Sequence, residues 1–141
     1  MTNINKYTAY RSGKHAKFIS AENGCRHEGC NPNQNWIRQF QVDGQIFTHG
    51  TQPLRCDWLI LNDDTQKAFY IELKGSDIAH AIEQIESTIN EFKQSIPNYK
   101  TACRIIYRSS NSHQIRSQAV IRFKRKYRDV EIRRTQLSEN L

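Results

Sequence analysis

Apolar runs along the second half of the chain predict a hairpin of two buried strands. Leu54–Leu61 is mostly apolar, and Ala68–Lys74 is rich in residues that favour strands. The polar segment 62–67 between them is short enough to be a turn. We therefore expect these two runs to pair as antiparallel neighbours, with the second strand closed by Gly75.

The apolar spacing changes after this hairpin. Isoleucine and phenylalanine recur every three or four residues from Ile78 to Ile96, which predicts one amphipathic helix of about 20 residues. Ser76 or Asp77 can cap its first turn, and Pro97 ends it. The other predicted elements are strands at 17–20, 36–42, 45–47 (after the turn Asp43-Gly44), 101–108 and 129–134, and a basic helix over 114–127.

A hairpin followed by a helix and another strand predicts an α/β fold with a mixed β-sheet flanked by helices. The 141 residues fit a single domain, 1–141, with its core over about 36–134. We expect Ile71 and Leu73 to pack beneath the long helix, because they alternate with the polar residues of the same strand.

Composition narrows the class of protein. The chain is 37% hydrophobic and 25% charged, as in ordinary globular proteins. The longest apolar run, Trp58–Leu61, is far shorter than the ~20 residues of a membrane span, and residues 1–14 lack a secretory signal. We therefore expect a cytoplasmic protein with reduced cysteines and no membrane partner.

Positive charge is concentrated near the C-terminus. The formal net charge is +7, yet residues 103–134 alone hold ten basic and two acidic side chains, a balance of +8. Such a tract is typical of a surface that binds a polyanion, so nucleic acid is the expected partner. The basic residues that we expect to contact it are Arg122, Lys124, Arg125, Lys126 and Arg128.

The segment Cys25–Cys30 contains two cysteines around His27 and permits two interpretations. A closed zinc site needs four ligands, and a second ligand pair is not evident in the sequence. We therefore favour a polar loop with incidental cysteines and keep zinc as the alternative.

Three polar side chains in the predicted hairpin form the candidate site. Glu72 and Lys74 are two residues apart on one strand, so they share a face. The short turn brings Asp57 opposite Glu72, so the two carboxylates converge beside the Lys74 ammonium. Two carboxylates and the Leu73 carbonyl suit a hard divalent cation such as Mg²⁺, with water and a substrate phosphate completing its shell. Lys74 can then orient an attacking water and offset developing charge.

These residues resemble a known motif. The segment Pro53 to Asp57, a spacer, and Ile71-Glu72-Leu73-Lys74-Gly75 are similar to the PD-(D/E)XK nuclease superfamily of restriction-type endonucleases and resolvases. The likeness covers about residues 50–96. It implies a restriction endonuclease-like core and phosphodiester hydrolysis that depends on Mg²⁺, for which Mn²⁺ can substitute.

The resemblance also assigns roles to residues. It implies that Asp57 and Glu72 are metal ligands, with Lys74 as the catalytic lysine and Gln84 as the glutamine that some members carry on the next helix. His80 lies one turn before Gln84 on the same side, and we expect it to contact nucleic acid. The chain departs from the family pattern in the position of Pro53 and in lacking a tyrosine after Gln84. The N-terminal helical glutamate of many members has no clear counterpart in the sequence, and Glu22 and Glu28 are candidates for it.

The expected function is a metal-dependent DNA endonuclease acting as a homodimer. Two alternatives remain open at this point. One is a non-catalytic nucleic-acid-binding module on the same fold, and the other is a toxin-like nuclease that cleaves RNA. Metal-assisted attack on a phosphate does not depend on the sugar, so the sequence does not separate DNA from RNA.

Overall fold

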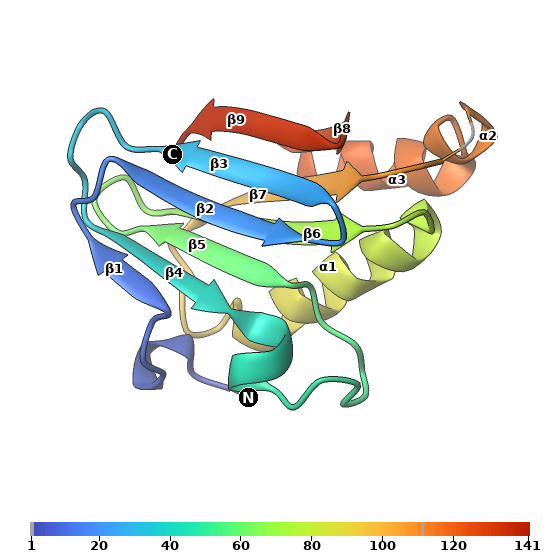
Figure 1. The fold of residues 1–141 in the computed structure, drawn as a ribbon. Helices are drawn as coiled ribbons and strands as arrows, with labels where there is room; N and C mark the ends of the chain where they lie inside the picture. Colours follow the sequence, from blue (N-terminus) through green and yellow to red (C-terminus); the bar gives the residue numbers. More distant parts are fainter. Residues whose placement is uncertain (1, 111) are drawn as a thin grey trace.

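The computed structural model describes residues 2–110 and 112–141, and it places two sheets and a helical layer against one another (Figure 1). In the larger sheet the strands lie in the order β1 (Arg11–Gly13), β4 (Ile37–Gln41), β5 (Trp58–Asn62), β6 (Lys67–Lys74), β7 (Lys100–Tyr107) and β8 (Val130–Arg134). Neighbours from β1 to β6 are antiparallel, whereas β6, β7 and β8 are parallel. The prediction of an α/β protein with a mixed sheet is confirmed.

A second sheet, which the sequence did not predict, covers one face of the first. Its strands lie in the order β2 (Lys17–Glu22), β3 (Cys25–Cys30) and β9 (Gln136–Asn140), with β2 and β3 antiparallel and β3 and β9 parallel. Phe18 from β2 packs with Ile71 and Leu73 of β6 in the core between the sheets. The expectation that Ile71 and Leu73 lie beneath the helix is therefore wrong, because they face the second sheet.

The helices cover the opposite face of the larger sheet (Figure 1). Helix α1 (Ile78–Phe92) buries Ile82 and Ile85 against Leu59 and Tyr70 of the sheet. Asp77 caps it by accepting from the His80 N–H at 3.0 Å, as predicted. The helix ends at Phe92 instead of reaching Ile96, because the chain turns before Pro97 and the Ser95 N–H donates to the Phe92 carbonyl.

Three other predicted boundaries are wrong. The basic helix is broken into one turn, α2 (Ser112–Ile115), and a longer helix, α3 (Gln118–Tyr127), because the Ser117 hydroxyl accepts from the Val120 N–H and starts a new helix. The predicted strand at 45–47 is a turn over Val42–Ile46 that the Phe47 N–H closes onto the Val42 carbonyl. Strand β5 begins at Trp58, because the Cys56 N–H donates to Thr88 Oγ1 of α1 at 2.7 Å instead of to the sheet.

The polar loop expected at residues 25–30 is instead strand β3, the middle strand of the second sheet. Alternation along β3 buries Cys25 and His27 and turns Cys30 to the other face. All four cysteines are free thiols. Because Cys30 and His27 point to opposite faces, this segment cannot gather the ligands of the zinc alternative.

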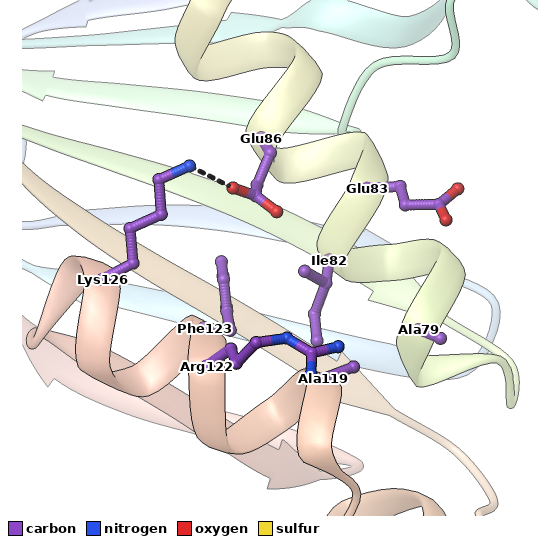
Figure 2. Close-up of a pocket in the computed structure, with 8 residues that line it drawn as sticks. All are labelled: Ala79, Ile82, Glu83, Glu86, Ala119, Arg122, Phe123 and Lys126. Atoms are coloured by element: carbon purple, nitrogen blue, oxygen red, sulfur yellow. Dashed lines mark hydrogen bonds and ion pairs between the residues drawn. The ribbon is translucent and has the colours of Figure 1, made fainter.

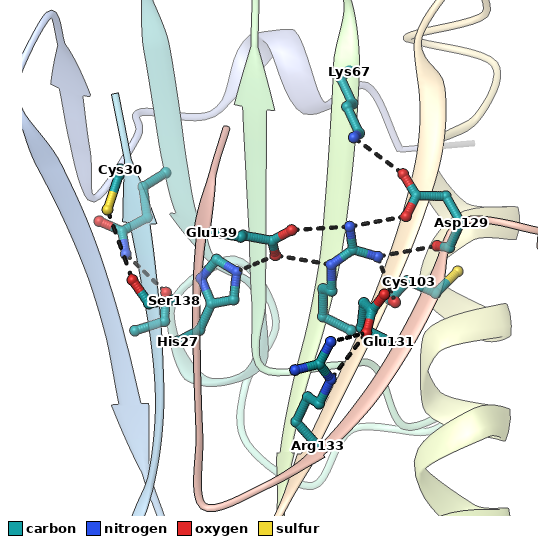
Figure 3. Close-up of polar contacts among 12 residues, drawn as sticks. His27, Cys30, Lys67, Cys103, Asp129, Glu131, Arg133, Ser138 and Glu139 are labelled. Carbon is teal, nitrogen blue, oxygen red and sulfur yellow. Dashed lines mark hydrogen bonds and ion pairs between the residues drawn. The ribbon is translucent and has the colours of Figure 1, made fainter. Parts of the chain in front are cut away.

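A buried polar cluster joins the two sheets (Figure 3). The Arg104 guanidinium, 3% exposed, pairs with Glu139 of β9 at 2.8 Å and with Asp129 at 2.9 Å. The fully buried His27 ring also contacts Glu139, at 2.7 Å. Burial raises the pKa of Glu139, but the hydrogen bonds from His27 and Arg104 outweigh it and lower this pKa to about 2. Arg104, counted in the basic tract, is therefore an internal structural charge and no part of a polyanion-binding surface.

Candidate functional site

The two predicted carboxylates meet where β5 begins and β6 ends. Trp58 of β5 pairs with Ile71 of β6, so the preceding residue Asp57 comes opposite Glu72, as the hairpin pattern predicts. The Asp57 N–H donates to Glu72 Oε1 at 3.2 Å, and Asp57 Oδ2 accepts from the Leu73 N–H at 2.8 Å. Asp57 is 6% exposed and Glu72 is 2% exposed. Two acidic side chains are thus fixed together in a nearly dry environment.

Lys74 stands beside this pair and is held by α1. Its Nζ lies 3.7 Å from Glu72 Oε2 and donates to Gln84 Oε1 at 2.7 Å. His80 Nδ1, one helical turn before Gln84, lies 3.3 Å from the same nitrogen. Gln84 is itself fixed, because its Nε2 donates to the Arg55 carbonyl at 3.3 Å. The structure therefore brings Asp57, Glu72, Lys74, Gln84 and His80 into one cluster.

The carbonyl of Leu73, expected to be a third metal ligand, already has a partner. Asn23 Nδ2, in the turn between β2 and β3, donates to it at 3.0 Å. A carbonyl oxygen has two lone pairs, so one acceptor position remains on Leu73. Asn23 was not among the residues predicted for this site.

Glu22, at the end of β2, lies next to Asp57 and enlarges the acidic cluster. Burial raises the pKa of Asp57 most, and the neighbouring charge of Glu22 raises it further, to about 7, against the opposing hydrogen bond from the Leu73 N–H. Burial and the charge of Asp57 also hold the pKa of Glu72 well above its usual range, while Lys74 acts in the opposite sense. Of the two glutamates named from the sequence, Glu22 reaches the site, whereas Glu28 pairs with Lys17 at 2.8 Å on the outer face of the second sheet.

A clear sequence signal marks the turn that positions Glu22 and Asn23. The dipeptide Asn23-Gly24 has positive φ at both residues, 53° and 73°, which is the geometry of a tight two-residue hairpin turn. Asn-Gly is the strongest short-range sequence signal for such a hairpin, and it predicts the pairing of β2 with β3. Recognising it would have placed residue 22 at a strand end.

A shallow hollow lies next to His80 and Gln84, the two α1 residues that contact Lys74. It is formed by the first three turns of α1 and the loop before Asp57, and its lining includes Pro53, His80 and Gln84. The side chain of Lys74 is 22% exposed, in contrast to the buried carboxylates. A substrate group could therefore approach the cluster past His80 and Gln84.

The oxygen ligands of this cluster suit a hard cation that takes few of its ligands from the protein. Within residues 2–110 and 112–141, no group of three or more His, Cys, Asp or Glu side chains is gathered so as to hold a metal ion. Mg²⁺, however, is commonly bound through one or two carboxylates, with waters and substrate phosphates as its other ligands. Asp57, Glu72 and the Leu73 carbonyl are oxygen donors of this kind.

The basic residues predicted to bind nucleic acid lie on or directly after α3. Arg122 and Lys126 border a groove between α1 and α3 whose floor is Ile82 and Phe123 (Figure 2). Lys126 Nζ is paired across this groove with Glu86 at 2.9 Å. The others are exposed: Lys124, Arg125 and Arg128.

The fold and the cluster define a mixed α/β protein with a buried acidic pair and a lysine at the carboxyl end of a central strand. Comparisons with protein-family models, with curated proteins and with solved structures found no match to the chain. Among the described residues, no helix is both long enough and apolar enough to cross a membrane.

Proposed function

We propose that the protein is a metal-dependent nuclease of the PD-(D/E)XK type that hydrolyses phosphodiester bonds, with DNA as substrate and Mg²⁺ or Mn²⁺ as cofactor. The proposal includes a restriction endonuclease-like core formed by the larger sheet and α1. The observation that supports it is the convergence of Asp57, Glu72 and Lys74 from two neighbouring strands, with carboxylates only 6% and 2% exposed. Burying two like charges together is costly, and a cation bound between them would offset that cost.

Asp57 and Glu72 would be the protein ligands of the cation. Their raised pKa values mean that they retain protons at a pH where exposed carboxyl groups have lost them, so cation binding would release protons. Metal affinity should consequently increase with pH through the region of about pH 7. When bound, the cation supplies Lewis-acid polarisation of a phosphoryl oxygen.

Lys74 would orient the attacking water and stabilise charge that develops on the phosphate. An ammonium group has three donors, and Gln84 Oε1 takes one of them at 2.7 Å. The contact with Gln84 fixes the direction of the ammonium, so the remaining donors need little reorganisation during the reaction. Gln84 is thus a positioning residue in this proposal.

The test is cleavage of duplex DNA, branched DNA, single-stranded DNA and RNA, each with Mg²⁺, with Mn²⁺ and with a chelator. We expect the wild-type protein to cut DNA only with metal, and Glu72→Gln and Lys74→Met each to reduce the rate at least about 100-fold. The exposed Lys93, which caps the C-terminus of α1, provides a matched control, so Lys93→Met should cut normally. Circular dichroism verifies that each variant is folded.

Each further result of this panel has a definite meaning. Undiminished cutting by both Glu72→Gln and Lys74→Met would overturn the proposal. Binding without product under any metal condition would also overturn it, in favour of a non-catalytic binding module. Cutting of RNA alone would overturn the assignment of DNA as substrate.

A further inference from the structure

The strand register identifies two arginines beside the acidic cluster that the basic-tract prediction did not select. In the parallel strands β6, β7 and β8, Lys74 pairs with Tyr107, and Tyr107 pairs with Arg134. Adjacent strands are about 4.8 Å apart, so the backbone of Arg134 lies about 10 Å from that of Lys74. This separation equals the axial length of about three base pairs of duplex DNA.

Arg108 is closer still to the cluster. Its N–H donates to the Lys74 carbonyl at 3.1 Å, at the point where β6 and β7 end together. Its side chain lies over the Asn23-Gly24 turn, since a Cβ added at Gly24 would be 3.2 Å from Arg108 Cδ. The same turn donates to the Leu73 carbonyl through Asn23. Arg108 and the candidate metal ligands therefore share one edge of the sheet.

Both arginines are available for a ligand. Arg108 and Arg134 are exposed, and in the part of the chain that the structure describes neither forms a salt bridge. Arg133 differs, because it is paired with Glu131 at 2.6 Å. These two exposed cations have no acidic partner, and they lie beside the acidic cluster of Glu22, Asp57 and Glu72. They are suited to bind phosphates of a nucleic-acid strand next to the phosphate that enters the cluster.

The basic C-terminal end of α3 lies near the opposite end of strands β7 and β8 from Arg108 and Arg134. The chain passes from α3 into β8 at Val130, which pairs with Cys103, four residues before Tyr107 on β7. At about 3.3 Å per residue, this is about 13 Å from the edge that carries Arg134. Lys124 and Arg125, in the last turn of α3, are on this distant side.

We infer that Arg108 and Arg134 bind the phosphodiester backbone of the substrate beside the cleaved bond, on the side of the acidic cluster where β7 and β8 lie, and that Lys124 and Arg125 do not. This inference rests on the proposed nuclease function and deepens it by naming the substrate-binding surface. It assigns the surface to the carboxyl edge of β6, β7 and β8.

The test compares two double variants that each remove two positive charges. Binding of a fluorescein-labelled DNA duplex is measured by anisotropy at several salt concentrations, with chelator present to prevent cleavage. Each lost phosphate contact should reduce the slope of log K against log salt by about 0.9, so Arg108→Ala/Arg134→Ala should reduce it by about 1.8. We expect its affinity at 0.1 M salt to fall at least about tenfold. Lys124→Ala/Arg125→Ala should keep the wild-type slope.

Lysine substitutions provide a second control for charge. Arg108→Lys/Arg134→Lys keeps both cations, and it should retain most of the slope if the contacts are made to phosphates. Equal losses in the two alanine variants would overturn the inference in favour of diffuse electrostatic attraction, and a larger loss in the Lys124/Arg125 variant would assign the surface to α3. Metal-dependent cleavage by wild type, lost in Glu72→Gln, would uphold the nuclease proposal under either result. If the wild-type protein neither binds nor cuts any nucleic acid, both proposals are wrong.

Discussion

The buried carboxyl pair should make the stability of the metal-free protein decrease as pH rises. The pKa of Asp57 is about 7 in the folded protein, against 3.8 for an unperturbed group. Between these values the folded chain retains a proton that the unfolded chain has lost, so the free energy of unfolding falls with increasing pH. Each unit of pKa difference is worth about 1.4 kcal/mol. From pH 5 to pH 8, Asp57 alone should therefore lower the stability by about 2–3 kcal/mol.

Asp57→Asn tests this magnitude directly. Asparagine keeps the shape of the side chain and can accept from the Leu73 N–H, but it cannot ionise. It also removes the charge that raises the pKa of Glu72, so both contributions to the slope become smaller. We expect thermal unfolding of the wild type without divalent metal to shift downward by about 10 °C from pH 5 to pH 8. Asp57→Asn should lose most of this shift.

The control for this measurement is Glu83→Gln, which removes an exposed carboxylate from α1 and should leave the wild-type shift unchanged. Adding Mg²⁺ at pH 8 should restore stability to the wild type and not to Asp57→Asn, since only the former has two charged ligands. If wild type and Asp57→Asn show the same pH dependence, or if the wild type becomes more stable from pH 5 to pH 8, the two carboxylates are not electrostatically coupled as described.

Two further predictions concern the second sheet. Arg104→Met leaves Glu139 and Asp129 without their buried partner, so it should lower the free energy of unfolding, measured in urea, by about 3–5 kcal/mol. Arg133→Met removes one partner of an exposed pair and should change the free energy of unfolding by less than about 1 kcal/mol. Similar effects of the two variants would contradict the structural role of the buried cluster. Gly29→Ala places a Cβ 2.7 Å from Leu141 Cδ2, and because this partly exposed C-terminal side chain can turn away, the substitution should cost no more than about 1 kcal/mol. Deleting Leu141 in that variant should recover part of the loss, and a melting temperature that stays low would show that the clash is elsewhere.

Local patterns explain which elements were predictable. The isoleucine period of α1 and the strand-forming residues of β6 lie within single elements, so they appear in the sequence without knowledge of the fold. Strand β3 carries arginine, histidine and glutamate in place of an apolar alternation, and its parallel partner β9 lies more than 100 residues later. The strand predicted at 17–20 is β2 of this sheet, but for its pairing with β3 the sequence signal was the Asn23-Gly24 dipeptide.

The part of the candidate site that lies within the β5–β6 hairpin could be predicted from the sequence. Because side chains alternate along a strand, the turn length alone places Asp57 opposite Glu72 and sets Lys74 on the face of Glu72. Which face lies under the helix depends on what covers the other face, so the sides of Ile71 and Leu73 were predicted wrongly without the second sheet. Glu22 reaches Asp57 only through that sheet.

The basic tract shows why a charge count does not locate a binding surface. Among the ten basic residues between 103 and 134, Arg104 is buried in an ion-pair cluster and Lys126 is paired with Glu86, while Arg108 and Arg134 reach the edge of the acidic site. Arg108 and Arg134 are 26 residues apart in the sequence, and the parallel pairing of β7 with β8 brings the two strand ends together. Lys124 and Arg125 contribute equally to the net charge, yet they lie in the last turn of α3, near the opposite end of strands β7 and β8. A cation therefore assists the proposed chemistry according to the strand end at which it lies, and the two alanine double variants test this because each removes two positive charges, from opposite ends of the strands.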